Sequence, residues 1–124
     1  MFNKKILIVD DDVLNKDLLA DYLIRKGFKN VLTAAKADES LEIIEREKPD
    51  FIILDIQLED HIDGVEILRR TKARLSQNSK VVMLSGHKDA YEDECLQLGA
   101  MEFWGKPIKP NVILESVKRI LSTP

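Results

Sequence analysis

The feature that most constrains this chain is the alternation of short apolar runs with stretches of helical periodicity. Five apolar runs occur in order, at residues 5–9, 30–34, 51–54, 81–84 and 102–104. Continuous runs of this kind suit strands that are covered on both faces. Between them, apolar residues recur at three- and four-residue spacing, which predicts helices. Five strand–helix units in a row predict an α/β fold, a parallel sheet with helices on both faces and right-handed crossovers.

The predicted helices have apolar stripes, and several have recognisable ends. Asp12 is suited to cap the first helix, and Asp89 and Glu92 have the spacing of a capping pair for the fourth. Gly27 suits the position after the first helix, and Pro110 the first turn of the last. The expected stripes are Leu18, Leu19, Tyr22 and Leu23; Leu41 and Ile44; Val65, Leu68 and Leu75; Tyr91, Cys95 and Leu98; and Ile113, Val117, Ile120 and Leu121.

Length and charge limit the classes of function. A chain of 124 residues fits one domain, which we expect to span residues 1–124. Its 22 acidic and 19 basic residues give a net charge of −3, which argues against nonspecific binding of nucleic acid. No apolar run approaches the ~20 residues that span a membrane, and we recognise no signal peptide. The single cysteine, Cys95, excludes an internal disulfide, so we expect a cytoplasmic protein.

Chemically active side chains follow four of the five predicted strands. Asp10 and Asp11 come directly after the first strand and Asp55 after the third, while Ser85 ends the fourth and Lys106 follows the fifth. In parallel α/β sheets, ligands bind outside the carboxyl ends of the strands. We therefore expect these carboxylates, the hydroxyl and the ammonium to meet at one edge of the sheet.

This combination suits phosphoryl chemistry. Clustered carboxylates raise one another's pKa unless positive charge neutralises them, and Mg²⁺ prefers such oxygen ligands. A bound cation and Lys106 together can stabilise the charge of a transferring phosphoryl group. Ser85 can donate a hydrogen bond to a phosphoryl oxygen, and the Asp55 carboxylate can act as the nucleophile.

The chain resembles the receiver domains of two-component response regulators from Lys5 to about Leu121. Each matching motif is short, but together they occur in the order and at the spacings of that family. The motifs are Ile8-Val9-Asp10-Asp11-Asp12, Ile53-Leu54-Asp55, Asp63-Gly64, Val82-Met83-Leu84-Ser85-Gly86, Gly99-Ala100 and Lys106-Pro107.

The resemblance implies a flavodoxin-like, doubly wound (βα)5 fold with strand order 2-1-3-4-5. It also implies that Asp55 is the phosphoacceptor and that Mg²⁺, which Mn²⁺ can replace, binds beside it. Asp11 would contact the metal directly and Asp10 through water, while Gln57 would offer its backbone carbonyl.

The remaining roles follow from the same resemblance. Ser85 and Lys106 would contact the phosphoryl group, and Phe103 aligns with an aromatic switch residue, although it lacks the hydroxyl of the tyrosine seen in many relatives. The Lys106–Pro107 bond would be cis. The loop after Asp55 is one residue longer than the commonest form and has Glu59 where proline is frequent.

The family's function would then apply to this chain. A phosphohistidine on a histidine kinase or phosphotransfer protein would donate its phosphoryl group to Asp55. The surface of the fourth helix, fifth strand and fifth helix would then change its affinity for a downstream protein or a fused output domain, as a two-state switch. Homodimerisation through this surface is left open. We expect no direct contact with nucleic acid or membrane, and self-directed phosphoryl transfer and hydrolysis rather than an enzyme's turnover.

Two other classes of function compete with this interpretation. A receiver-like domain could dock a partner without phosphorylation, but the presence of every site residue argues against it. A flavodoxin-like cofactor binder or hydrolase could use the same fold, yet the sequence lacks a glycine-rich phosphate loop and a nucleophile elbow. An aspartyl-phosphate hydrolase would need a further acid or base, for which we find no candidate.

Overall fold

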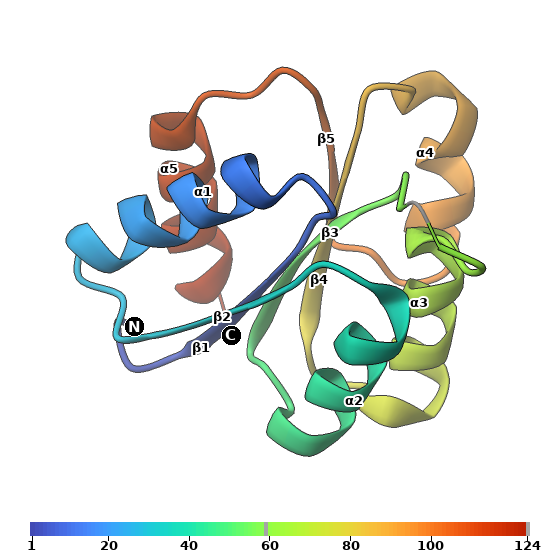
Figure 1. Cartoon of the computed structure of the whole chain (residues 1–124), viewed down its shortest axis with the longest axis horizontal. Helices are drawn as coiled ribbons and strands as arrows, with labels where there is room; N and C mark the ends of the chain where they lie inside the picture. Colours follow the sequence, from blue (N-terminus) through green and yellow to red (C-terminus); the bar gives the residue numbers. More distant parts are fainter. Residues whose placement is uncertain (59, 124) are drawn as a thin grey trace.

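The computed structural model describes residues 1–58 and 60–123, with the side chains of residues 88 and 89 outside this description. In this part of the chain, a parallel sheet has the order β2-β1-β3-β4-β5 (Figure 1). The doubly wound fold and its strand order are therefore confirmed. The strands are β1 (Lys5–Val9), β2 (Asn30–Ala34), β3 (Phe51–Asp55), β4 (Lys80–Ser85) and β5 (Glu102–Gly105).

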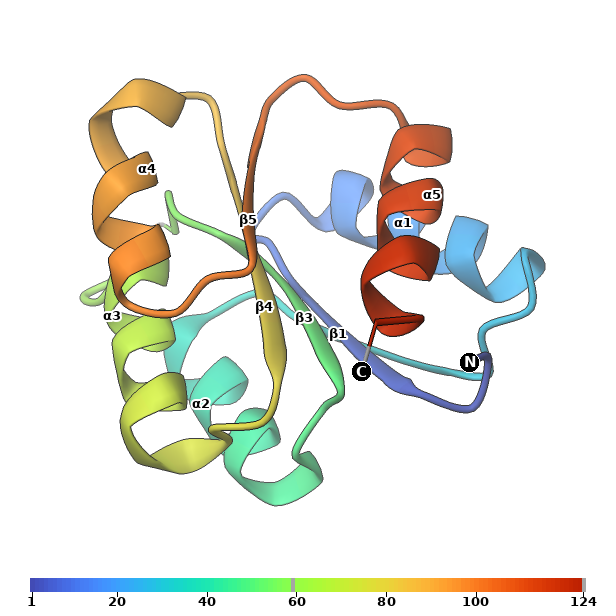
Figure 2. The ribbon, with the colours of Figure 1, turned by 180° about the vertical axis from the view of Figure 1, so that it is seen from behind.

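Helices cover both faces of the sheet. The pair α1 (Val13–Arg25) and α5 (Pro110–Leu121) lies on one face, and Figure 2 shows the same division from behind. The other face carries α2 (Ala37–Glu47), α3 (Gly64–Arg70) and α4 (Lys88–Gln97), and a π-helical turn, η1 (Thr71–Leu75), continues α3. No helix among the described residues combines the length and apolar character needed to cross a bilayer.

The core consists of two apolar clusters, one on each face of the sheet. Successive strand residues point to opposite faces, so Ile52 and Leu54 of β3 pack toward α2 and α3 while Phe51 and Ile53 pack toward α1 and α5. Every residue of β3 is buried. Burial on both faces explains why the strands appear in the sequence as unbroken apolar runs.

The structure confirms some predicted helix ends. Asp12 caps α1, its side chain accepting a hydrogen bond from the backbone N–H of Asn15 at 3.2 Å. Gly27, after the end of α1, has a φ of +115°, a conformation that favours glycine. The capping prediction for Asp89 is wrong, because α4 begins at Lys88 with His87 at the cap position, which places residue 89 inside the first turn.

One predicted stripe residue is also wrong. Leu18 was expected in the buried stripe of α1 but is 59% exposed. The buried residues of this helix are Lys16, Ala20 and Leu23. Residues two apart on a helix do not share a face, so a helix that turns residues 16 and 20 toward the sheet turns residue 18 toward solvent.

The strand register brings the predicted site residues to one edge of the sheet. Val9 lies opposite Leu54, so Asp10 emerges beside Asp55. Ser85 pairs with Gly105, directly before Lys106. The start of α3 packs tightly against the same edge, because a Cβ on Gly64 would overlap the carbonyl oxygen of Asp55.

Candidate functional site

Three carboxylates gather at the carboxyl edge of the sheet. Asp10, Asp11 and Asp55 each place one carboxylate oxygen within 4.8 Å of the others. Asp55 is only 2% exposed and Asp10 6%, while Asp11 is half-buried. Asp55 is held at the end of β3, whose apolar residues fill both faces of the core. The sequence prediction that these three side chains meet is confirmed.

The pKa of Asp10 is raised from its ordinary 3.8 to about 6. Burial is the largest cause, and the negative charge of Asp55 adds to it. The N–H of Asp12, which donates to Asp10 Oδ1 at 2.9 Å, and the charge of Lys106 act in the opposite direction. A carboxylate with a raised pKa is destabilised in its charged form, so the site favours the arrival of positive charge.

Lys106 supplies part of that positive charge. Its Nζ lies 2.8 Å from Asp55 Oδ2. Burial lowers the pKa of Lys106, but the hydrogen bond and charge of Asp55, with the charges of Asp10 and Asp11, outweigh burial and raise the pKa above its ordinary value. The Lys106–Pro107 bond is cis, as the sequence resemblance implied.

The donor set fits a hard divalent cation. Asp10, Asp11 and Asp55 contribute three negative charges against the single positive charge of Lys106, and all three offer oxygen atoms. Mg²⁺ prefers oxygen ligands, needs only one or two carboxylates and keeps several waters. The three carboxylates are therefore suited to hold Mg²⁺ beside the Asp55 side chain.

Gln57 and Ser85 complete the edge of the site. The backbone N–H of Gln57 donates to Asp55 Oδ1 at 3.2 Å, so residue 57 stays close to the end of β3. Ser85 Oγ accepts a hydrogen bond from the backbone N–H of His87 at 2.9 Å and donates to Gln57 Oε1 at 3.2 Å. Sequence reasoning gave Gln57 a role through its backbone carbonyl and missed this side-chain contact, for which the sequence carries no local signal.

Phe103 lies apart from the carboxylates. It is 6% exposed and belongs to the apolar cluster beneath α3 and α4, opposite Met83 in the sheet register. The ring is therefore already packed into the core. Its role as a switch residue stays a prediction.

The loop after Asp55 is tied to the start of α2. Asp60 Oδ2 accepts a hydrogen bond from the backbone N–H of Ala37 at 2.9 Å, and Asp60 Oδ1 lies 2.7 Å from His61 Nδ1. The backbone hydrogen bond is the largest cause of a lowered pKa at Asp60. Glu59, where many relatives have proline, lies outside the described residues.

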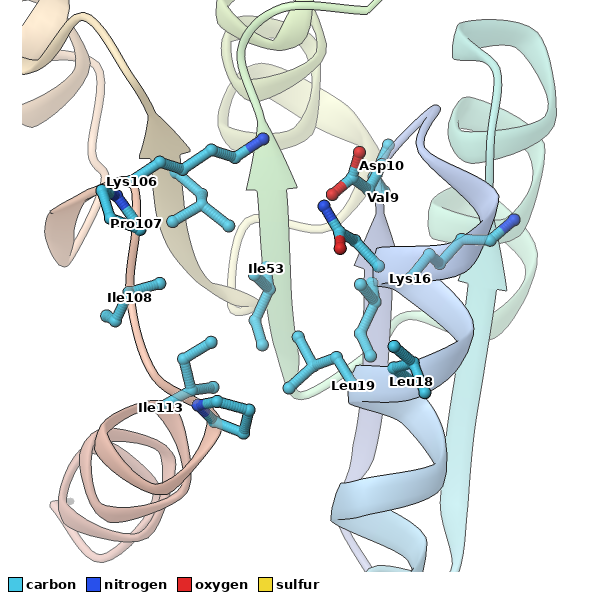
Figure 3. Close-up of a pocket in the computed structure, with 14 residues that line it drawn as sticks. Val9, Asp10, Lys16, Leu18, Leu19, Ile53, Lys106, Pro107, Ile108 and Ile113 are labelled. Carbon is cyan, nitrogen blue, oxygen red and sulfur yellow. The ribbon is translucent and has the colours of Figure 1, made fainter.

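A mainly apolar pocket adjoins the site (Figure 3). It has a volume of about 560 Å³ and lies between α1 and the segment that follows β5. Leu19, Ile53 and Ile113 line its interior, and Asp10 and Lys106 lie at the end nearest the carboxylates.

Comparisons with known proteins agree with this geometry. The family model of the response regulator receiver domain matches residues 6–118. Sporulation initiation phosphotransferase F of Bacillus subtilis (strain 168) is 34% identical over 123 residues, 98% of this chain and 96% of the relative. The alkaline phosphatase synthesis transcriptional regulatory protein PhoP of the same organism is 36% identical over 120 residues, 96% of this chain and 49% of the relative. The crystal structure of the receiver domain of NtrX from Brucella abortus matches with a TM-score of 0.87 at 34% identity, covering 97% of this chain and 100% of that one.

Proposed function

This chain belongs to the response regulator receiver domain family, and we propose that it accepts a phosphoryl group on Asp55 from a phosphohistidine. The donor is a histidine kinase or a phosphotransfer protein, and residues 1–124 act as one receiver domain in the cytoplasm. The observation that carries the proposal is the buried Asp55 carboxylate, which lies within 4.8 Å of two further carboxylates and 2.8 Å from the Lys106 ammonium.

Transfer breaks one bond and forms one. An oxygen of the Asp55 carboxylate attacks phosphorus, the phosphorus–nitrogen bond of the donor breaks, and the imidazole leaves with the bonding electron pair. Asp11, Asp55, the backbone carbonyl of Gln57 and, through water, Asp10 would hold Mg²⁺, which would supply electrostatic stabilisation of the phosphoryl oxygens. Mn²⁺, which also accepts oxygen ligands, can take its place.

The chain's own residues position and neutralise the group. Lys106 already lies beside Asp55 Oδ2, so its ammonium needs little movement to contact a phosphoryl oxygen on that carboxylate. Burial of Asp55 strengthens this electrostatic interaction. Ser85 supplies a hydroxyl donor from the neighbouring strand. Later hydrolysis of the aspartyl phosphate returns the domain to its unphosphorylated state.

The phosphoryl group changes partner affinity through the surface of α4, β5 and α5. The contacts of Ser85 and Lys106 with the phosphoryl group favour one of two conformations of this surface, and Phe103, in β5, adjusts its packing with it. The partner is a downstream protein or a fused output domain, and homodimerisation through the same surface is one form this response can take. The domain itself contacts neither nucleic acid nor membrane.

The proposal is tested by intact mass after incubation with Mg²⁺ and a small acyl-phosphate donor. We expect the mass of one added phosphoryl group, lost when a chelator removes Mg²⁺ and absent in Asp55→Asn. If no group is added and Mg²⁺ binding is also absent, the phosphoacceptor function is wrong, and a docking module that works without phosphorylation becomes the better interpretation.

A further inference from the structure

Ser85 has no free hydrogen to offer a phosphoryl group in this structure. Its side chain is fully buried. A hydroxyl has one donor hydrogen, and Ser85 directs it to Gln57 Oε1 at 3.2 Å while accepting from the N–H of His87. Ser85 must therefore break its bond to Gln57 before it can donate to a phosphoryl oxygen on Asp55.

We propose that the Gln57 side chain restrains Ser85 in the unphosphorylated state and so opposes the switch. Gln57 is then a positioning residue, with a role separate from that of its backbone carbonyl. This inference rests on the proposed function, because it concerns the competition between the Gln57 amide and a phosphoryl group for one hydroxyl.

The geometry explains why Gln57 can hold this position. Its backbone N–H is bound to Asp55 Oδ1 at 3.2 Å, which anchors the residue beside the acceptor. The residue as a whole is exposed, so the amide can swing into solvent when Ser85 changes partner. The hydrogen bond also links the loop after β3 to the end of β4, two elements that must adjust together when a group is added between them.

The positions of Phe103 and Lys106 favour the Ser85–Gln57 pair by elimination. The Phe103 ring is already buried in the core, so the switch does not require the aromatic ring to move inward from this position. Lys106 is likewise already beside Asp55. Among the site residues described here, Ser85 is the one whose donated hydrogen bond goes away from the acceptor.

The test measures binding of beryllofluoride, a phosphoryl analogue, at saturating Mg²⁺ by isothermal titration calorimetry. Gln57→Met removes the strong acceptor at similar side-chain length. A hydrogen bond between neutral groups contributes roughly 0.5–1.5 kcal/mol, so we expect beryllofluoride to bind about 2- to 10-fold more tightly to Gln57→Met than to the unmodified chain. Gln57→Ala should change affinity in the same direction.

The matched control repeats the substitution in a Ser85→Ala background. Without the hydroxyl there is nothing for Gln57 to restrain, so the double variant should bind like Ser85→Ala alone, which gives a non-zero interaction energy in the double-mutant cycle. An unchanged affinity in Gln57→Met, or an equal gain in the Ser85→Ala background, would overturn the inference and leave the proposed function intact. No binding by the unmodified chain with Mg²⁺ would overturn both.

Discussion

The two edges of the sheet differ in how their charged side chains are arranged: they form separate ion pairs at the amino edge and a cluster of carboxylates at the carboxyl edge. At the amino edge, the strands β1, β4 and β5 begin with charged side chains that have partners of their own. Lys5 of β1 binds Glu47 at 2.9 Å, and Glu102 of β5 accepts two hydrogen bonds from Arg119, at 2.6 and 3.0 Å. Lys80 of β4 donates to backbone carbonyls at the end of α5. These contacts join strands to helices and lower the pKa of Glu47 and Glu102.

The carboxyl edge instead concentrates charge of one sign. Asp10, Asp11 and Asp55 converge there, with Lys106 bound to Asp55, and the pKa of Asp10 is raised rather than lowered. The same parallel sheet thus has one edge where ion pairs lower the pKa of carboxyl groups and one where burial and a neighbouring carboxylate raise the pKa of Asp10. This edge is a candidate cation site, because a cation that stabilised the charged form of Asp10 would bind the folded state selectively.

The largest expected difference between the edges comes from removing one lysine at each. Lys106→Met should slow phosphoryl uptake from a small acyl phosphate roughly 10²- to 10³-fold, because the site loses a positioned donor for the transferred group. Lys80→Met should keep the rate of uptake and lose about 1–2 kcal/mol of stability, since two backbone carbonyls lose a donor. The measurement is the time course of intact mass. Similar uptake rates in the two variants would remove the distinction between the edges.

A second prediction concerns the raised pKa of Asp10 without metal. A carboxyl whose folded-state pKa is raised from 3.8 to about 6 contributes stability that is present below pH 3.8 and lost as pH rises through 6. Asn cannot ionise, so Asp10→Asn does not lose this stability as the pH rises. With Mg²⁺ removed by a chelator at pH 7, its free energy of unfolding should exceed that of the unmodified chain by on the order of 2–3 kcal/mol.

Urea unfolding from pH 4 to pH 8 measures the difference. The difference should shrink toward pH 4. It should also shrink at pH 7 when Mg²⁺ saturates the site, because a bound cation would stabilise the charged form of Asp10 in the unmodified chain. If Asp10→Asn is less stable than the unmodified chain at pH 7 in chelator, ionised Asp10 does not destabilise the folded state.

The smallest effect is expected at Glu102, where the pH dependence has the opposite sign. The hydrogen bond from Arg119 is the largest cause of its lowered pKa, so the stabilisation is present above the ordinary value of 4.5 and is lost as pH falls through the folded-state pKa. Glu102→Gln should lose less than about 1 kcal/mol at pH 7 and progressively less as the pH falls below 4.5, with unchanged phosphoryl uptake. A loss that did not shrink as the pH was lowered would count against this account of the amino edge.

Sequence reasoning could predict most of the carboxyl edge because its signal is local and strong. Asp10, Asp55 and Ser85 each follow an unbroken apolar run, and parallel strands bring such positions together whatever the details of the helices. The same runs predicted the sheet, since burial on both faces leaves no room for polar alternation.

What could not be predicted depends on contacts between distant residues. The Ser85–Gln57 hydrogen bond joins two residues that are 28 positions apart, one at the end of β4 and one in the loop after β3. The exposure of Leu18 depends on which side of α1 faces the sheet. The helical spacing of the sequence allows Leu18 on that side, but the structure places Lys16 there instead.

The most direct test of the central claim is to locate the phosphoryl group by chemical trapping. After reaction with an acyl phosphate and Mg²⁺, borohydride reduces an aspartyl phosphate to homoserine, and peptide mass spectrometry identifies the residue. We predict homoserine at position 55 alone, and none when Mg²⁺ is removed before the reaction. Homoserine at position 10 or 11, or at no position, would contradict the account of Asp55 as the acceptor within a carboxylate cluster that requires a cation.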